Sequence, residues 1–104
     1  MNKRVEVLSF SGCPNVSATV SLVAEVAADL AVEVDLHVID VPDVTAAVAQ
    51  CFLGSPTIRI EGVDVEPGSE TRTDFALACR LYQTLDGPRG LPTRKWLEAA
   101  LRAG

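Results

Sequence analysis

The junction that follows the first apolar stretch constrains the fold of this chain most. Residues 5–10 are rich in apolar, strand-favouring side chains and predict a strand. Ser11-Gly12 predicts a turn, and Cys13-Pro14 opens a long amphipathic stretch in which proline favours the first helical position. A strand that passes directly into a helix predicts an α/β fold, with a strand–helix–strand unit that is parallel and right-handed.

The rest of the chain continues this alternation of strands and helices. Periodicity and turn residues predict a helix over about 14–31, an edge strand over about 33–40, a helix over about 44–53 that Gly54 ends, a hairpin with strands around 58–60 and 63–65, and a final helix from 92 or 93 to 103. Residues 66–72 and 86–90 are predicted to be loops, whereas residues 74–83 fit a helix face and a strand equally well.

Size and charge exclude several classes of function. The chain has 104 residues, 48% of them hydrophobic, which suits a single domain over residues 1–104. A net charge of −5 argues against binding to nucleic acid or anionic membranes, which requires clustered lysine and arginine. No apolar run is long enough to be a transmembrane helix or the core of a signal peptide, so we expect a cytoplasmic protein with reduced thiols.

The position of Cys13 predicts a reactive thiol. If Pro14 is the first helical residue, Cys13 is the N-cap, and its sulfur can accept hydrogen bonds from first-turn N–H groups such as that of Val16. The positive end of the helix dipole also favours the thiolate, which is the nucleophilic form of cysteine. The sequence therefore indicates nucleophilic sulfur chemistry centred on Cys13.

Two motifs resemble the thioredoxin-like superfamily. They are Ser11-Gly12-Cys13-Pro14 after the first strand and Gly54-Ser55-Pro56-Thr57 before the third. The resemblance implies a four-stranded mixed sheet with helices on both faces, and it leaves residues 66–91 as an insertion before the last helix. With the later run Ala78-Cys79-Arg80-Leu81-Tyr82, the motifs are also faintly similar to small thioredoxin-like proteins labelled alkylmercury-lyase-like.

The resemblance also implies roles for individual residues. Pro56 stands where the superfamily has a cis proline that packs against the active-site cysteine, and Thr57 stands where the backbone faces a substrate. The substrate-binding residues implied in this way are Gly12, Pro14, Ser55, Pro56 and Thr57.

One departure from the superfamily pattern changes the expected chemistry. Where thioredoxins have Cys-x-x-Cys, this chain has valine at position 16, so the usual second thiol is absent. Three possibilities remain. Cys13 acts alone and glutathione or another small thiol resolves its mixed disulfide; Cys79, in the insertion, approaches Cys13 and resolves it; or the protein keeps the fold but has lost redox chemistry. Glutathione binding would need a basic residue, and the sequence does not place Arg59, Arg72 or Arg80 near Cys13.

The remaining candidate residues are interpreted as structural. Cys51 is predicted to lie on the apolar face of the second helix, and His37 on the polar face of the edge strand. Tyr82 and Trp96 are expected in or near the core. Structural zinc prefers ligands at short spacing, so the three widely separated cysteines predict no metal site of that kind.

These observations predict a thiol–disulfide oxidoreductase-like protein without a cofactor. Its partners would be protein or low-molecular-weight thiols and disulfides, with Cys13 as nucleophile and Cys79 or an external thiol as the resolving group. Two alternatives remain open: a non-catalytic binding or adaptor protein with the same fold, and a protein that handles soft metals or organomercurials through Cys13 and Cys79.

Overall fold

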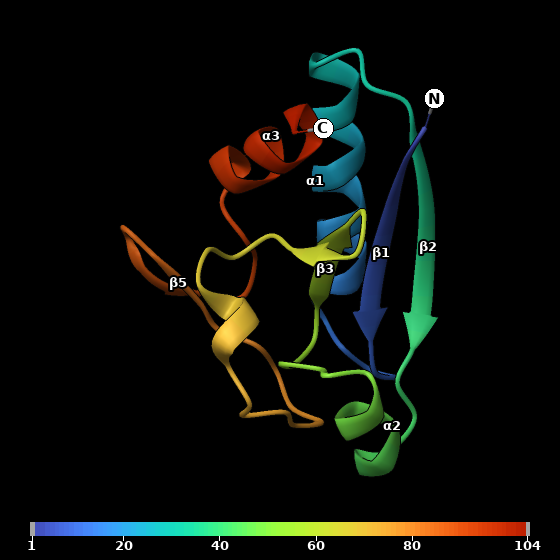
Figure 1. The fold of residues 1–104 in the computed structure, drawn as a ribbon, viewed down its shortest axis with the longest axis vertical. Helices are drawn as coiled ribbons and strands as arrows, with labels where there is room; N and C mark the ends of the chain where they lie inside the picture. Colours follow the sequence, from blue (N-terminus) through green and yellow to red (C-terminus); the bar gives the residue numbers. More distant parts are fainter. Residues whose placement is uncertain (1, 104) are drawn as a thin grey trace.

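The computed structural model describes residues 2–103 as a mixed α/β fold built on a four-stranded sheet (Figure 1). The strands lie in the order β2-β1-β3-β4. Their bounds are Lys3–Ser9 for β1, Val34–Asp40 for β2, Thr57–Ile60 for β3 and Val63–Asp64 for β4. β1 pairs parallel with β2 and antiparallel with β3, so the sheet is mixed and β2 is an edge strand, as its sequence predicts.

The β3–β4 hairpin forms at the predicted turn. Glu61 and Gly62 both have positive φ, 52° and 80°, and Ile60 pairs with Val63 across them. A two-residue turn with positive φ at both positions matches the right-handed twist of the strands, which explains the glycine at the second position. This part of the sequence prediction is confirmed.

Helices cover both faces of β1. Side chains alternate along a strand, so Val5 and Val7 point to one face and Leu8 to the other. Val5 and Val7 belong to a core cluster with buried residues of α1 (Val16–Asp29) and α3 (Arg94–Arg102). Leu8 belongs to a second cluster with Ala47 of α2 (Val44–Ala49). In Figure 1, α1 and α3 lie together, and α2 lies at the opposite end of the sheet from the N-terminus.

The first two helices end earlier than predicted, and for the same reason. After α1, the Val32 N–H bonds the Ala27 carbonyl and Ala31 has φ of 54°. After α2, the Phe52 N–H bonds the Ala47 carbonyl and Cys51 has φ of 54°. This pattern is the Schellman C-cap, in which glycine normally occupies the left-handed position. Because alanine and cysteine stand there, the sequence does not mark either helix end.

Residues 66–91, which we call the insertion, lie between β4 and α3. They contain the short 3₁₀ helix η1 (Ser69–Thr71) and a hairpin of β5 (Tyr82–Thr84) and β6 (Gly87–Arg89). The loop predicted over 86–90 is therefore wrong, since part of it pairs as β6. The ambiguous segment before it forms no helix: Cys79 makes a parallel bridge with Ser55, and Tyr82 begins β5.

The final helix agrees with its prediction. Thr93 is the N-cap of α3, and its side chain accepts a hydrogen bond from the Trp96 N–H. Leu97 and Leu101 are buried against the sheet, and Trp96 packs partly buried beside them.

Candidate functional site

The strand register brings the two sequence motifs to one end of the sheet. Leu8 near the end of β1 pairs with Thr57 at the start of β3. Because the strands are antiparallel, the chain that leaves β1 and the chain that enters β3 lie beside each other. We call residues 10–15, which follow β1, the Cys13 turn. This turn and Ser55-Pro56 therefore share the same end of the molecule.

Backbone hydrogen bonding defines the Cys13 turn. The Cys13 N–H donates to the Phe10 carbonyl at 3.2 Å, which closes a four-residue turn. Gly12 has φ of +89° at the third position, where a type II turn requires positive φ, and no atom lies within 4 Å of the place where a Cβ would stand. Cys13 itself is half-buried, and its thiol is free.

Cys13 is not the N-cap of α1, which corrects the sequence prediction. Asn15 is the N-cap, the Thr19 N–H donates to its carbonyl, and Pro14 lies in the preceding turn. The Asn15 side chain makes no capping bond; its Nδ2 instead lies 2.5 Å from where a Cβ on Gly90 would stand. The helix therefore starts two residues later than predicted, and the hydrogen bonds described for residues 2–103 include none to the Cys13 sulfur.

Ser55, Pro56 and Thr57 are buried, and the Ser55–Pro56 peptide bond is cis. The Ser55 N–H donates to the Ala78 carbonyl at 2.8 Å, and the Arg80 N–H donates to the Ser55 carbonyl at 2.9 Å. The insertion therefore occupies the backbone edge at Ser55. A substrate could therefore not form hydrogen bonds with the backbone N–H of Ser55, which already donates to Ala78, and would have to contact other atoms of this segment.

A buried ionic cluster holds the insertion against β3 and β4. Arg80, whose side chain is fully buried, donates from both terminal nitrogens to the carboxylate of Asp64 at 2.7 and 2.9 Å. It also donates to Glu66 at 2.9 Å and to the Thr57 hydroxyl at 3.1 Å, and its Cζ lies 4.2 Å from the ring centre of Tyr82. We call these five residues the Arg80 cluster.

The cluster also reaches the Pro56 backbone. The Tyr82 hydroxyl donates to the Pro56 carbonyl at 2.5 Å. Burial raises the pKa of Tyr82 far above its ordinary value, so the phenol stays a neutral donor. Burial lowers the pKa of Arg80, but hydrogen bonds and charge from Asp64 and Glu66 outweigh burial, and the net shift is upward. The cluster thus fixes the position of the residues on both sides of Pro56.

In the sequence, Arg80 is a possible glutathione contact, and neither Asp64 nor Glu66 stands out. The structure excludes that role in this conformation, because the guanidinium is buried and paired with carboxylates. One signal was available: a single arginine within the mostly apolar run 77–82 indicates a buried charge, and a buried charge requires a partner.

The three cysteines have different surroundings, and all three thiols are free. Cys79 is exposed and lies beside Ser55, on the insertion. Cys51 is exposed as well, so its predicted burial on the apolar face of α2 is wrong. It follows the helix in a left-handed conformation, which turns its side chain away from that face.

A depression of about 500 Å³ lies next to the Cys13 turn. Asn15 of the turn lines it together with Arg89 of β6 and Thr93 at the start of α3. The sequence did not reveal this depression, because it forms between the insertion and two helix starts that are far apart in the chain.

Comparison with protein-family models, with curated proteins and with solved structures found no match for this chain. Within residues 2–103, no group of three or more His, Cys, Asp or Glu side chains is arranged to hold a metal ion. None of the helices that the structure describes has the length and apolar character needed to cross a membrane.

Proposed function

We propose that this chain has a thioredoxin-like fold. The order of elements through β4, the mixed sheet β2-β1-β3-β4 and the final helix against the face of α1 support this assignment. The placement of the Cys13 turn opposite Ser55-Pro56 supports it further. On this view residues 66–91 are an insertion that extends the sheet end at Ser55.

The function that this geometry supports best is thiol–disulfide exchange at Cys13. The observation that carries the proposal is the position of the free, half-buried thiol of Cys13. It lies in the turn after β1, at the end of the sheet that also holds Pro56. The depression lined by Asn15 gives a small thiol or disulfide room to lie next to this turn. Its partners would be low-molecular-weight or protein disulfides.

The proposed reaction needs one protein thiol and one external thiol. The Cys13 thiolate attacks a substrate disulfide; a Cys13–substrate disulfide forms, the substrate S–S bond breaks, and the leaving thiolate takes a proton from water. A second thiolate then attacks the mixed disulfide and releases Cys13. Cys79, across Ser55 on the insertion, is the internal candidate for this second step.

Competitive alkylation of the wild-type protein tests the proposal. Iodoacetamide is added at neutral pH, and the modified fraction of each cysteine is followed over time by mass spectrometry. Cys51 and Cys79 are exposed and Cys13 is half-buried, so exposure alone predicts that Cys13 reacts most slowly. An activated nucleophile predicts the opposite order, with Cys13 modified first.

A non-catalytic binding protein is the second candidate. It is favoured by the start of α1 at Asn15, which leaves the Cys13 sulfur outside the helix cap. If the alkylation rates follow exposure, with Cys13 slowest, the enzymatic proposal is wrong and the binding function replaces it.

A further inference from the structure

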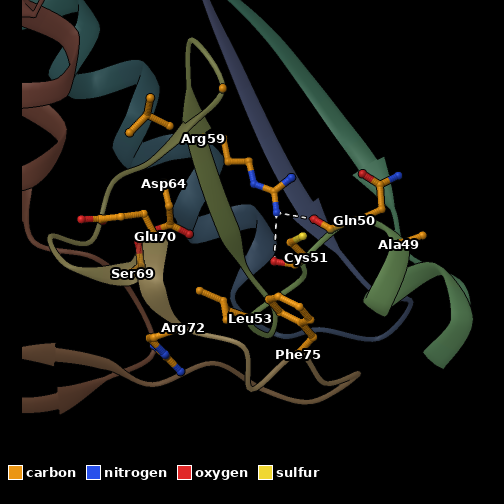
Figure 2. Close-up of a pocket in the computed structure, with 12 residues that line it drawn as sticks. Ala49, Gln50, Cys51, Leu53, Arg59, Asp64, Ser69, Glu70, Arg72 and Phe75 are labelled. Atoms are coloured by element: carbon orange, nitrogen blue, oxygen red, sulfur yellow. Dashed lines mark hydrogen bonds between the residues drawn. The ribbon is translucent and has the colours of Figure 1, made fainter.

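A second depression lies away from the Cys13 turn, between the end of α2 and the β3–β4 hairpin (Figure 2). Its volume is about 510 Å³, and its lining residues include Gln50, Cys51, Leu53, Arg59 and Phe75. No residue of the Cys13 turn contributes to it. A site here would therefore be independent of the function proposed above.

An exposed, free thiol opens into this depression. Cys51 stands at the left-handed position after α2, and the Arg59 guanidinium holds its backbone by donating to its carbonyl at 3.1 Å. The same nitrogen of Arg59 donates to the Gln50 carbonyl at 2.5 Å. Figure 2 shows the Cys51 sulfur and the Arg59 guanidinium at the same end of the depression.

Arg59 retains a positive charge that the protein does not neutralise. Within residues 2–103, no carboxylate lies within ion-pair distance of its guanidinium. Its cross-strand partners are Asp64 on β4 and Glu6 on β1; both oxygens of Asp64 accept hydrogen bonds from Arg80, and Glu6 is paired with Arg4 at 3.3 Å. Only one nitrogen of Arg59 is used in the hydrogen bonds described above, so further donors remain for a ligand.

The other charged groups around the depression lie farther from Cys51. Arg72 is bound to Asp74 through two hydrogen bonds, at 2.9 and 2.6 Å. In Figure 2 the side chains of Arg72 and Glu70 extend away from Arg59. The end beside Cys51 thus combines one uncompensated cation, one thiol and the apolar side chains of Leu53 and Phe75.

We propose that this depression binds small carboxylate-bearing disulfides, and that Cys51 forms a mixed disulfide with them. Arg59 attracts the carboxylate by its charge and donates to it from Nη1 or Nε, because Nη2 already donates to the carbonyls of Gln50 and Cys51. The Cys51 thiol loses its proton to water, and the resulting thiolate attacks one sulfur of the disulfide. A Cys51–S–S bond forms, the original S–S bond breaks, and the leaving thiolate takes a proton from water. Cys51 is oxidised and the leaving sulfur is reduced.

The test compares an anionic with a cationic disulfide on single-cysteine proteins. The Cys13→Ser/Cys79→Ser variant keeps only Cys51, and the matched control Cys13→Ser/Cys51→Ser keeps only Cys79, which is also exposed. Each reacts with oxidised glutathione and with cystamine at low salt, and mass spectrometry gives the rates. The anionic-to-cationic rate ratio is expected to be about two- to fivefold higher for Cys51, the range of a partly exposed ion pair.

Removing the charge beside Cys51 gives the second arm of the test. Arg59→Gln is expected to lower the ratio for Cys51 to the value measured for Cys79. If Arg59→Gln fails to fold, Gln50→Glu is measured in its place. It puts an acid on an exposed lining residue without touching the core, and it is expected to lower the ratio for Cys51. Equal ratios for Cys51 and Cys79, or a Cys51 ratio that neither substitution changes, would overturn the proposal.

Discussion

The Cys13 turn and the Arg80 cluster lie on either side of Ser55-Pro56, yet they are held by different kinds of interaction. The Cys13 turn depends on one backbone hydrogen bond and a glycine with positive φ. The Arg80 cluster depends on charged hydrogen bonds among buried side chains that reach Thr57 directly and Pro56 through Tyr82. The difference indicates that a rigid scaffold on one side supports a more open segment, where the reactive thiol lies.

The largest loss of stability is expected when the charge at the centre of the Arg80 cluster, the Arg80 guanidinium, is removed. Arg80→Met leaves the mostly buried carboxylate of Asp64 without its ion-pair partner and leaves Glu66 with the longer 3.3 Å pair to Arg72, and we expect a loss of about 3–5 kcal/mol in the free energy of unfolding. Urea unfolding followed by circular dichroism measures it. The matched control is Arg89→Met on exposed β6, expected within about 0.5 kcal/mol of wild type. A loss below 1 kcal/mol for Arg80→Met would contradict a scaffold built on this cluster.

Alanine at two glycines tests the same contrast with smaller effects. Both Gly54 and Gly12 have positive φ, but a Cβ on Gly54 would lie 2.9 Å from the Cβ of Arg80, whereas a Cβ on Gly12 meets nothing within 4 Å. We expect Gly54→Ala to cost about 3 kcal/mol and Gly12→Ala about 1 kcal/mol. Thermal and urea unfolding of the two variants measure the difference. Equal costs would show that the insertion does not pack closely at Gly54.

The smallest effect is expected at the phenol of Tyr82. Tyr82→Phe removes one buried hydrogen bond to the Pro56 carbonyl and should cost about 1 kcal/mol near neutral pH. Because the folded-state pKa of Tyr82 is raised, the unfolded chain releases its proton first as the pH rises. Wild type should therefore lose stability above about pH 10, relative to its value below that pH, and Tyr82→Phe should lack this part of the loss.

Absorbance gives an independent measure, since Tyr82 is the only tyrosine in the chain. Phenolate absorbance should appear together with unfolding at high pH. Ionisation of Tyr82 in the folded protein near pH 10 would be inconsistent with a buried, hydrogen-bonded phenol.

Local patterns in the sequence predicted much of the sheet but not the clustering of charges. The strand before Cys13, the edge position of β2 and the Glu61-Gly62 hairpin follow from short-range periodicity and turn chemistry. The partners of Arg80 depend on the path of the insertion, which has no clear period, so sequence alone could not pair them.

The details at Cys13 and Cys51 were missed for related reasons. The helix α1 starts at Asn15, whose side chain packs against Gly90 from a distant part of the chain. The exposure of Cys51 depends on a left-handed backbone conformation that cysteine rarely adopts. Helix periodicity gives no information on either feature, whereas the position of Cys13 between β1 and α1 was predicted correctly.

The most direct test of the proposed chemistry is turnover of a small disulfide with excess glutathione as the external thiol. Wild type, Cys13→Ser and Cys51→Ser are compared under identical conditions, with the uncatalysed rate subtracted. The proposal predicts that Cys13→Ser loses at least about tenfold, because the mixed disulfide at Cys13 is then absent, and that Cys51→Ser, which leaves Cys13 in place, loses much less. A rate that Cys13→Ser leaves unchanged would contradict thiol–disulfide exchange at Cys13.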